Sequence, residues 1–260
     1  MPAEPTDPTS QTGPLALPTF YLGQLQIAAA RNAAERLKAL ALRAVIFRGD
    51  RAKQDDQDAF DPHCLHLMVS VRGTEELLAT ARLRLLDGRA AIETSYSAQF
   101  YDLSPLARER RRLLEIGRLC LRPDHRANPD ILRALLAGIA RAAHSSGAQL
   151  LIGCTSFPGA DPREHAPALS HLARDHLGPA HLRPGRRSGR IVDLVSLASE
   201  MQPEAADMPG LLRLYLGLGA WVSDHAVRDL DLDTLHVFTA VDLSTLPSRR
   251  VRLLSGLSRQ

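Results

Sequence analysis

Two charged residues stand in a short apolar run, where a charged side chain is costly. Glu115 and Arg118 interrupt segment 113–121, whose other members are apolar apart from Gly117. Burying a charge is unfavourable unless a partner or a reaction uses it. A carboxylate that is partly removed from water binds protons more tightly, so it suits the removal of a proton from an attacking amine. Glu115 is therefore the candidate base.

The segments around these two residues are typical of a strand, a helix and a second strand. Segment 113–121 is followed by apolar residues at helical spacing that start after Pro129 and end before Gly147. A second apolar run, 150–154, comes next, and the turn-forming residues 156–159 are expected to end it. A crossover of this kind predicts two parallel strands with a helix on one face.

Regular strand geometry would place Glu115 and Arg118 on opposite faces, because side chains alternate and the two residues are an odd number of positions apart. A β-bulge adds one residue and reverses that alternation. Glycine is common at bulges. We therefore predict a bulge at Ile116–Gly117 that brings both side chains to one side of the sheet.

Other elements are predicted from the spacing of apolar residues. We expect helices from Leu22 to about Arg48 and over 166–177, a short helix at Ser104, and strands over 63–71, 77–86, 191–197 and 235–241. The strongly apolar segment 209–222 is either a buried helix or a surface that touches lipid, and buried packing is the favoured alternative.

Composition limits the class of protein. The chain has 260 residues, 45% of them hydrophobic, and a net charge of +3, which suits one globular domain. We assign residues 19–247 to this domain and residues 1–18 and 248–260 to tails. Aromatic residues make up only 4%, which disfavours a nucleic-acid platform. The three cysteines form no C-x-x-C pair, so we expect reduced thiols, no metal site and a cytoplasmic location. No apolar run reaches the roughly 18 residues of a membrane span.

Two charged clusters leave alternatives open. An acidic stretch that includes Asp58 and Asp61 is either a solvated loop or a site for a cationic amine. An arginine cluster that includes Arg108, Arg111 and Arg112 directly precedes segment 113–121, and it is either an exposed helix end or a docking surface for an acidic partner.

Four fragments together resemble one family, the bacterial ornithine–acyl-[acyl carrier protein] N-acyltransferases of the GNAT superfamily. They are Phe60-Asp61-Pro62 with Cys64 and His66, Glu115-Ile116-Gly117-Arg118, Gly153-Cys154 with Ser156-Phe157-Pro158-Gly159, and Tyr215-Leu216 with Leu218-Gly219-Ala220. The resemblance runs from about Arg43 to Val241. It implies a GNAT-like α/β (α+β) fold, with a mixed central sheet flanked by helices. The chain departs from the family pattern at Leu65, Arg213 and His236, where an aspartate, a lysine and an acidic residue are common.

The resemblance implies transfer of a (3-hydroxy)fatty acyl group from acyl carrier protein to the α-amine of L-ornithine, the first step of ornithine-lipid synthesis. The donor would be a 4′-phosphopantetheine thioester, with no permanently bound cofactor, and peripheral contact with the inner membrane stays open. Alternatives are an acyl-homoserine-lactone synthase, an acyl-coenzyme A-dependent GNAT enzyme, and an inactive module that binds acyl carrier protein or membrane. The turn at 126–129 lacks the glycines of the usual GNAT phosphate loop, which disfavours coenzyme A.

The resemblance also implies roles for particular residues. Catalysis is assigned to Glu115, Arg118 and Arg82, with Glu115 paired to both arginines. The substrate-binding site would include Asp58, Asp61, Phe47, Arg43, Cys154 and Ser156. Because Cys154 and Ser156 have no evident paired base, we interpret them as structural residues and not as nucleophiles. Pantetheine would pass between the 113–121 and 150–154 strands. The pantetheine and its carrier would contact Leu121, Arg126, Asn128, Asp130, Arg108, Arg111 and Arg112.

Overall fold

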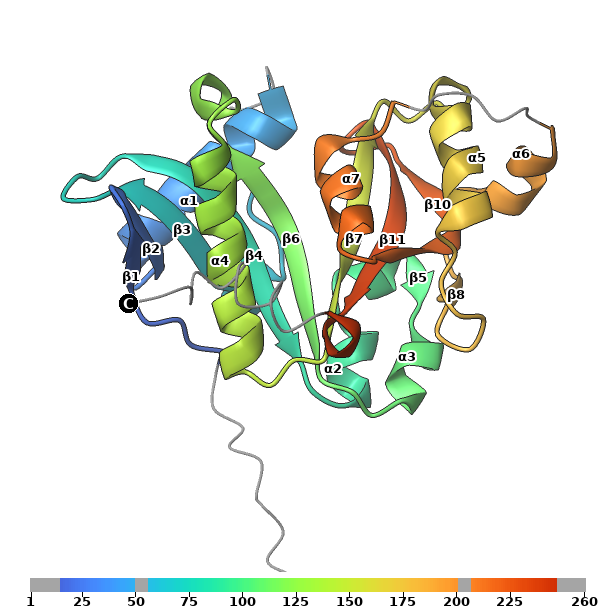
Figure 1. The fold of residues 1–260 in the computed structure, drawn as a ribbon, viewed down its shortest axis with the longest axis horizontal. Coiled ribbons are helices and arrows are strands. Elements are labelled where there is room, and N and C mark those ends of the chain that lie inside the picture. The colour runs from blue at the N-terminus through green and yellow to red at the C-terminus, as the bar shows by residue number, and fades with distance from the viewer. Residues whose placement is uncertain (1–14, 50–55, 201–206, 247–260) are drawn as a thin grey trace, which may run out of the picture.

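The computed structural model describes residues 15–49, 56–200 and 207–246, and most of its strands form one mixed sheet (Figure 1). In spatial order the strands are β1 (Phe20–Leu22), β2 (Leu25–Ala29), β3 (Leu65–Val71), β4 (Leu77–Leu86), β6 (Leu113–Leu121), β7 (Leu150–Pro158), β11 (Thr234–Asp242), β10 (Trp221–Asp229) and β9 (Ile191–Asp193). Only β6 and β7 are parallel neighbours among the described strands. A separate pair joins β5 (Tyr101–Asp102) to β8 (Gly185–Arg186).

Helices cover both faces of this sheet. They are α1 (Ala33–Arg48), α2 (Arg89–Glu93), α3 (Ser104–Arg108), α4 (Pro129–Ser145), α5 (Ala166–Asp175), α6 (Leu194–Glu200) and α7 (Gly210–Gly217). Leu67 of β3 packs with α4, whereas the next residue, Met68, packs with α1, so these two helices lie on opposite faces. Helices α5 and α7 cover the other half of the sheet on the α4 side (Figure 1). The predicted α+β fold class is therefore confirmed.

Strands β6 and β7 form a fork. They pair only over Leu113–Glu115 and Leu150–Ile152, and beyond these residues they separate. At the branching point a side chain on Gly153 would put its Cβ 2.5 Å from the carbonyl oxygen of Ile116. No larger residue fits that approach without moving a strand, which explains the glycine.

A β-bulge follows the branching point. Thr80 of β4 faces Cys120 of β6, but Arg82 faces Gly117, so β6 has one residue more than β4 over this interval. Arg118 lies in the extra stretch with a φ of +52°, a left-handed conformation that non-glycine residues adopt rarely. The predicted bulge is confirmed, but it lies at Arg118 and beyond rather than at Ile116–Gly117.

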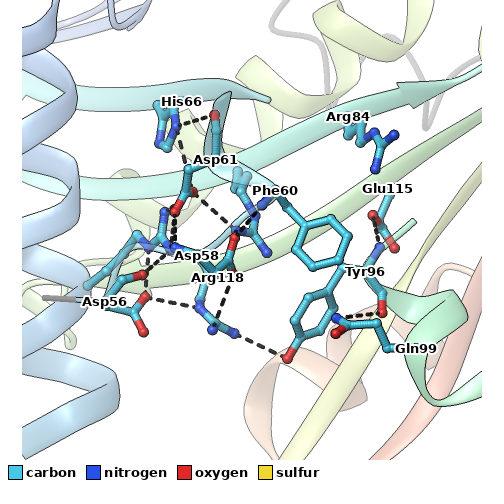
Figure 2. Close-up of polar contacts among 12 residues, drawn as sticks. Asp56, Asp58, Phe60, Asp61, His66, Arg84, Tyr96, Gln99, Glu115 and Arg118 are labelled. Carbon is cyan, nitrogen blue, oxygen red and sulfur yellow. Dashed lines mark hydrogen bonds and ion pairs between the residues drawn. The ribbon is translucent and has the colours of Figure 1, made fainter. Parts of the chain in front are cut away.

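The bulge changes which side chains share a face. Ile116 and Leu119 both pack toward α4, although an odd number of positions separates them. Glu115 and Arg118 accordingly point to the opposite face, where both reach Tyr96 (Figure 2). The sequence-based inference that the two charges lie on the same side is therefore confirmed.

Three predicted boundaries are wrong. Residues 20–29 form β1 and β2, and α1 begins only at Ala33, because the Asn32 side chain accepts a hydrogen bond from the Glu35 N–H and caps the helix there. Strand β7 does not turn at 156, because pairing with β11 continues to Pro158. The strand expected over 191–197 ends at Asp193, where α6 begins.

The apolar segment 209–222 contains α7 and the start of β10. Leu212 is fully buried against α5 and β10, which confirms the alternative of a buried helix. None of the described helices is both long and apolar enough to span a membrane. Of the two expected tails, residues 1–14 and 247–260 lie outside the described part, whereas Leu17 packs into the core.

Candidate active site

The fork opens into a cavity of about 220 Å³. Its walls include 116–119 of β6 and 151–156 of β7, mostly beyond the last paired residues, together with parts of α7 and β11. Of the residues expected at the site, those that line this cavity are Phe47, Arg82, Arg118, Cys154 and Ser156. A thioester arm inserted between the two separated strands would reach this space.

Beside the cavity lies a fully buried ion network. Arg43 donates hydrogen bonds from Nε to Asp56 Oδ2 (2.9 Å) and from Nη1 to Asp61 Oδ1 (2.6 Å), and all three side chains are at most 2% exposed. Burial alone would raise the pKa of Asp61, but the bonds from Arg43 and from the Asp58 N–H outweigh it and lower the pKa. Arg43 and Asp61 therefore support the site from beneath, without a surface that faces the cavity.

Arg82 and Arg118 connect this network to the cavity. Figure 2 shows Arg118 between Asp56 and the hydroxyl of Tyr96. Arg82 donates from Nη1 to Asp58 and to Asp61 Oδ1 (3.1 Å). Arg118 donates from Nε to Asp56 Oδ2 (3.0 Å) and places Nη2 3.6 Å from Asp58 Oδ2. That Asp58 oxygen accepts no hydrogen bond within the described residues, although it is buried. Asp58 Oδ2 is therefore a hydrogen-bond acceptor without a donor in the described part of the chain, and it lies beside the guanidinium groups of Arg82 and Arg118.

Glu115 makes different contacts from those expected. The residue is 5% exposed, Oε2 accepts the Tyr96 N–H (3.1 Å), and Oε1 accepts the Ser97 N–H (2.8 Å). These N–H groups open the 3₁₀ turn η3 (Ser97–Gln99), so the carboxylate holds that turn against β6. Glu115 forms no ion pair within the described chain, and its predicted pairing with Arg82 and Arg118 is wrong, because aspartates take both arginines.

Tyr96 is a site residue that the sequence did not reveal. The guanidinium carbons of Arg82 and Arg118 lie 5.4 and 5.3 Å from its ring centroid, and Arg118 Nη1 donates to its hydroxyl at 3.4 Å. Burial raises the pKa of Tyr96 to about 12, so the phenol keeps its proton at neutral pH. The position carries no spacing signal, because its partners come from strands that only the fold brings near.

Cys154 and Ser156 form one wall of the cavity. The Cys154 thiol donates to Ser97 Oγ at 3.7 Å, and burial raises the pKa of this thiol. A thiol that stays protonated is a poor nucleophile. The geometry therefore agrees with direct transfer to an amine rather than with an acyl-enzyme on Cys154.

The strands beside β7 bring two more titratable residues to the cavity, Asp229 of β10 and His236 of β11, of which the sequence marked only His236, as a departure from the family pattern. Asp229 is 8% exposed, and its Oδ1 accepts the N–H groups of Asp231 and Leu232. Burial lowers the pKa of His236 to about 4, and the Tyr101 hydroxyl donates to the His236 carbonyl (2.9 Å). The imidazole is therefore neutral at neutral pH, and Asp229 is a carboxylate that faces the cavity directly.

The residues expected to contact the carrier fall at two ends of β6. Arg126 and Asn128 lie beyond its end, where the fork is open; Arg126 is exposed, and Asn128 caps α4 by accepting the Asp130 N–H. Asp130 pairs with Arg133, and Leu121 packs into the core. At the paired end, Arg111 binds Asp242 (2.7 Å), Arg112 binds Asp87 (2.9 Å), and Arg108 is exposed.

Comparisons with known sequences identify the family. Residues 42–136 match the family model described as an acetyltransferase (GNAT) domain. The L-ornithine N(alpha)-acyltransferase of Rhodobacter capsulatus is 34% identical over 206 residues, which cover 77% of this chain and 79% of that protein. The enzyme of the same name from Brucella abortus is 30% identical over 249 residues, or 88% of each. The solved structure of FeeM, an N-acyl amino acid synthase from uncultured soil microbes, aligns with a TM-score of 0.46 and 12% identity over 90% of this chain and 98% of that one.

The sequence similarity extends over most of this chain and most of each curated relative. The match to the GNAT domain includes both arginines of the cavity and Glu115. The protein is an N-acyltransferase, and the chain belongs to the L-ornithine N(alpha)-acyltransferase family.

Proposed function

We propose that this enzyme transfers a (3-hydroxy)fatty acyl group from the 4′-phosphopantetheine thioester of acyl carrier protein to the α-amine of L-ornithine. The observation that carries the proposal is the forked cavity, which is lined by two arginines that both contact Asp58, a carboxylate whose buried Oδ2 accepts no hydrogen bond within the described residues. The product would be the first intermediate of ornithine lipid. The free thiols support a cytoplasmic location for the reaction.

Asp58 is the proposed partner of the side-chain ammonium of ornithine. Its Oδ2 lacks a hydrogen bond within the described part of the chain, and an ammonium supplies three donors. Asp61 does not compete, because Arg43, Arg82 and the Asp58 N–H already occupy it, the last at 2.8 Å. Asp61 instead fixes the Asp58 backbone. Arg118 and Tyr96 then lie on the cavity side, where the acceptor carboxylate would meet a guanidinium.

The donor arm would lie between β6 and β7, where their facing backbone groups are no longer paired with each other. The free α-amine attacks the thioester carbonyl carbon, the C–N bond forms, and the C–S bond breaks to release the pantetheine thiol. The amine gives up one proton, which we assign to Glu115 through a water molecule, and the thiolate takes up one proton. Backbone N–H groups at the bulge would stabilise the oxyanion.

The turn that precedes α4 supports acyl carrier protein, rather than coenzyme A, as the carrier of the acyl group. The turn at 126–129 has no glycine, and the N–H of Asp130 is already occupied by the Asn128 cap. Such a turn has little room to surround a pyrophosphate. The exposed Arg126 suits a single phosphate.

Purified enzyme supplied with ornithine and one long-chain 3-hydroxyacyl donor at a time tests the proposal. We expect acyl-ornithine, detected by mass spectrometry, with the acyl carrier protein donor and far less with the coenzyme A donor. Asp58→Asn should raise KM for ornithine about tenfold or more, because a charge-assisted hydrogen bond contributes about 1.5–3 kcal/mol. Absence of acyl-ornithine with every donor chain length would refute the proposal.

A further inference from the structure

A second cavity of about 200 Å³ lies between α4 and α7. It forms a groove, which we call the α4–α7 groove, with walls from 136–148, 215–218 and 241–246 and a floor of Ile116 and Leu151. Its lining is aliphatic apart from Tyr215 and His144. A ligand with amides or charges would lose its hydrogen bonds to water there and find few replacements.

The α4–α7 groove adjoins the forked cavity. Ile116, Leu151, Tyr215 and Val241 line both spaces. Two of these residues come from β6 and β7, directly beside the branching point. The groove therefore begins directly beside the place where a reactive carbon would lie in the fork.

The two helices present regular apolar faces to this groove. On α4 the lining residues Leu136, Ile139, Ala140 and Ala143 recur at helical spacing. Two of these residues are alanines, Ala140 and Ala143, and their small side chains leave the groove unfilled. On the α7 side, Leu212 and Leu216 pack against the protein core, whereas Tyr215 and Leu218 line the groove.

We propose that the α4–α7 groove binds the hydrocarbon chain of the acyl donor and thereby sets the preferred chain length. This inference rests on the proposed function for the identity of the donor. The apolar lining disfavours the pantetheine arm, whose amides need hydrogen-bond partners, and the walls shared with the forked cavity place the hydrocarbon chain next to its own thioester. Each buried methylene is worth about 0.8 kcal/mol, or about fourfold in affinity.

Ala140→Phe tests the groove, because Ala140 is half-buried and a phenyl ring there would fill the space. We expect kcat/KM for a long-chain acyl carrier protein to fall about tenfold or more, while the value for a butanoyl carrier protein stays within about twofold. Leu218→Ala, which enlarges the groove, should shift the preference toward longer chains. Ala34→Phe is the matched control, since Ala34 is exposed on α1 on the opposite face of the sheet.

Binding of both carrier proteins without ornithine, measured by calorimetry, separates this proposal from the proposed function. Loss of long-chain affinity in Ala140→Phe supports the groove even if no acyl-ornithine is formed. Equal losses for long and short chains, or an unchanged ratio in both groove variants, would overturn it. Leu246 lies on the groove wall. If the chain after Leu246 filled the groove in place of the acyl chain, the ratio of long-chain to short-chain values would stay unchanged.

Discussion

Each charged side chain at the site is held by a partner of opposite sign or by backbone N–H groups. Arg43, Arg48, Arg82 and Arg118 share their bonds among Asp56, Asp58 and Asp61, so four cations meet three anions, and Arg48 also pairs with the exposed Asp231. Removing one member would leave an uncompensated buried charge, which is strongly destabilising. Asp58 is the member whose Oδ2 accepts no hydrogen bond within the described residues; its side chain is more exposed, at 23%, than those of Asp56 and Asp61, although Oδ2 itself is buried.

Glu115→Gln should lower kcat/KM for ornithine by roughly 10²–10⁴-fold near neutral pH, the usual contribution of a general base. An α-amino group has a pKa of about 7.7–8.0 in peptides, so a rising pH supplies more free amine that needs no base. If Glu115 takes the proton, the deficit should therefore shrink as the pH rises. The pH profile of kcat/KM checks this expectation.

A deficit that stays constant with pH would contradict the role as base. It would leave Glu115 as the group that anchors Tyr96 and Ser97 to β6. Glu109→Gln is the matched control, because Glu109 is exposed just after α3, and this variant should keep the wild-type profile.

The sequence singled out Glu115 and Arg118 because charges inside an apolar strand are unusual. It could not assign their partners, since the choice between Asp58, Asp61 and Glu115 for an arginine depends on a loop that folds back from a distant part of the chain. Tyr96 was missed for the same reason. Residue type and spacing identified which residues carry charge at the site, but not which of them form ion pairs with each other.

At the scale of elements, the fork depends on one close approach between backbones. The β6–β7 pairing ends where Gly153 meets the Ile116 carbonyl, and the bulge at Arg118 then turns the following residues. The bulge was predictable from the sequence, because Glu115 and Arg118 can share one face of the sheet only if an extra residue reverses the alternation of side chains between them. Its location was not, because a left-handed arginine is an exception to the preference for glycine.

Gly153→Ala should damage activity more than stability. The new methyl group would have to push β7 away from Ile116, and such overpacking usually costs about 1–3 kcal/mol. Because the displaced strand forms a wall of the cavity, kcat/KM should fall by more than the loss in unfolding free energy would suggest. Denaturant unfolding and acylation rates check both parts.

Gly189→Ala serves as the control, since a Cβ at Gly189 meets no atom within 4 Å. It should leave rate and stability near the wild-type values. A Gly153→Ala variant with normal kcat/KM would show that the fork tolerates a wider opening.

At the scale of the molecule, the open end of the fork determines where a carrier protein can approach. A strand as long as β6 extends about 30 Å, so the basic residues before it and those after it are far apart. Arg126 lies at the open end, is exposed and forms no ion pair with the described residues. Arg111 and Arg112 lie at the paired end and hold the fold through Asp242 and Asp87.

Arg126→Glu should therefore raise KM for acyl carrier protein by up to about fivefold, the size of one exposed ion pair. The effect should shrink at high salt, because salt screens exposed charges. Arg108→Glu, equally exposed but at the paired end, should leave KM unchanged. The reverse result, with Arg108 sensitive and Arg126 not, would place the docking surface at the paired end.

The three-pair junction between β6 and β7 also affects how the enzyme can move. One hydrophobic core, centred on α4, is built from buried residues between Leu17 and Ala148, and the core under α5 and α7 uses residues from Phe157 onward. A further core, which includes Tyr101 and Phe238, crosses the junction at its paired end with the fully buried Leu113 of β6 and Leu150 of β7. A change in the angle between the two strands at this end would disturb that core, so the paired end is a fixed joint. The fork widens most easily at the open end, where β6 and β7 are no longer paired with each other. A bulky acylated product is therefore expected to leave through the open end while the paired end keeps its packing.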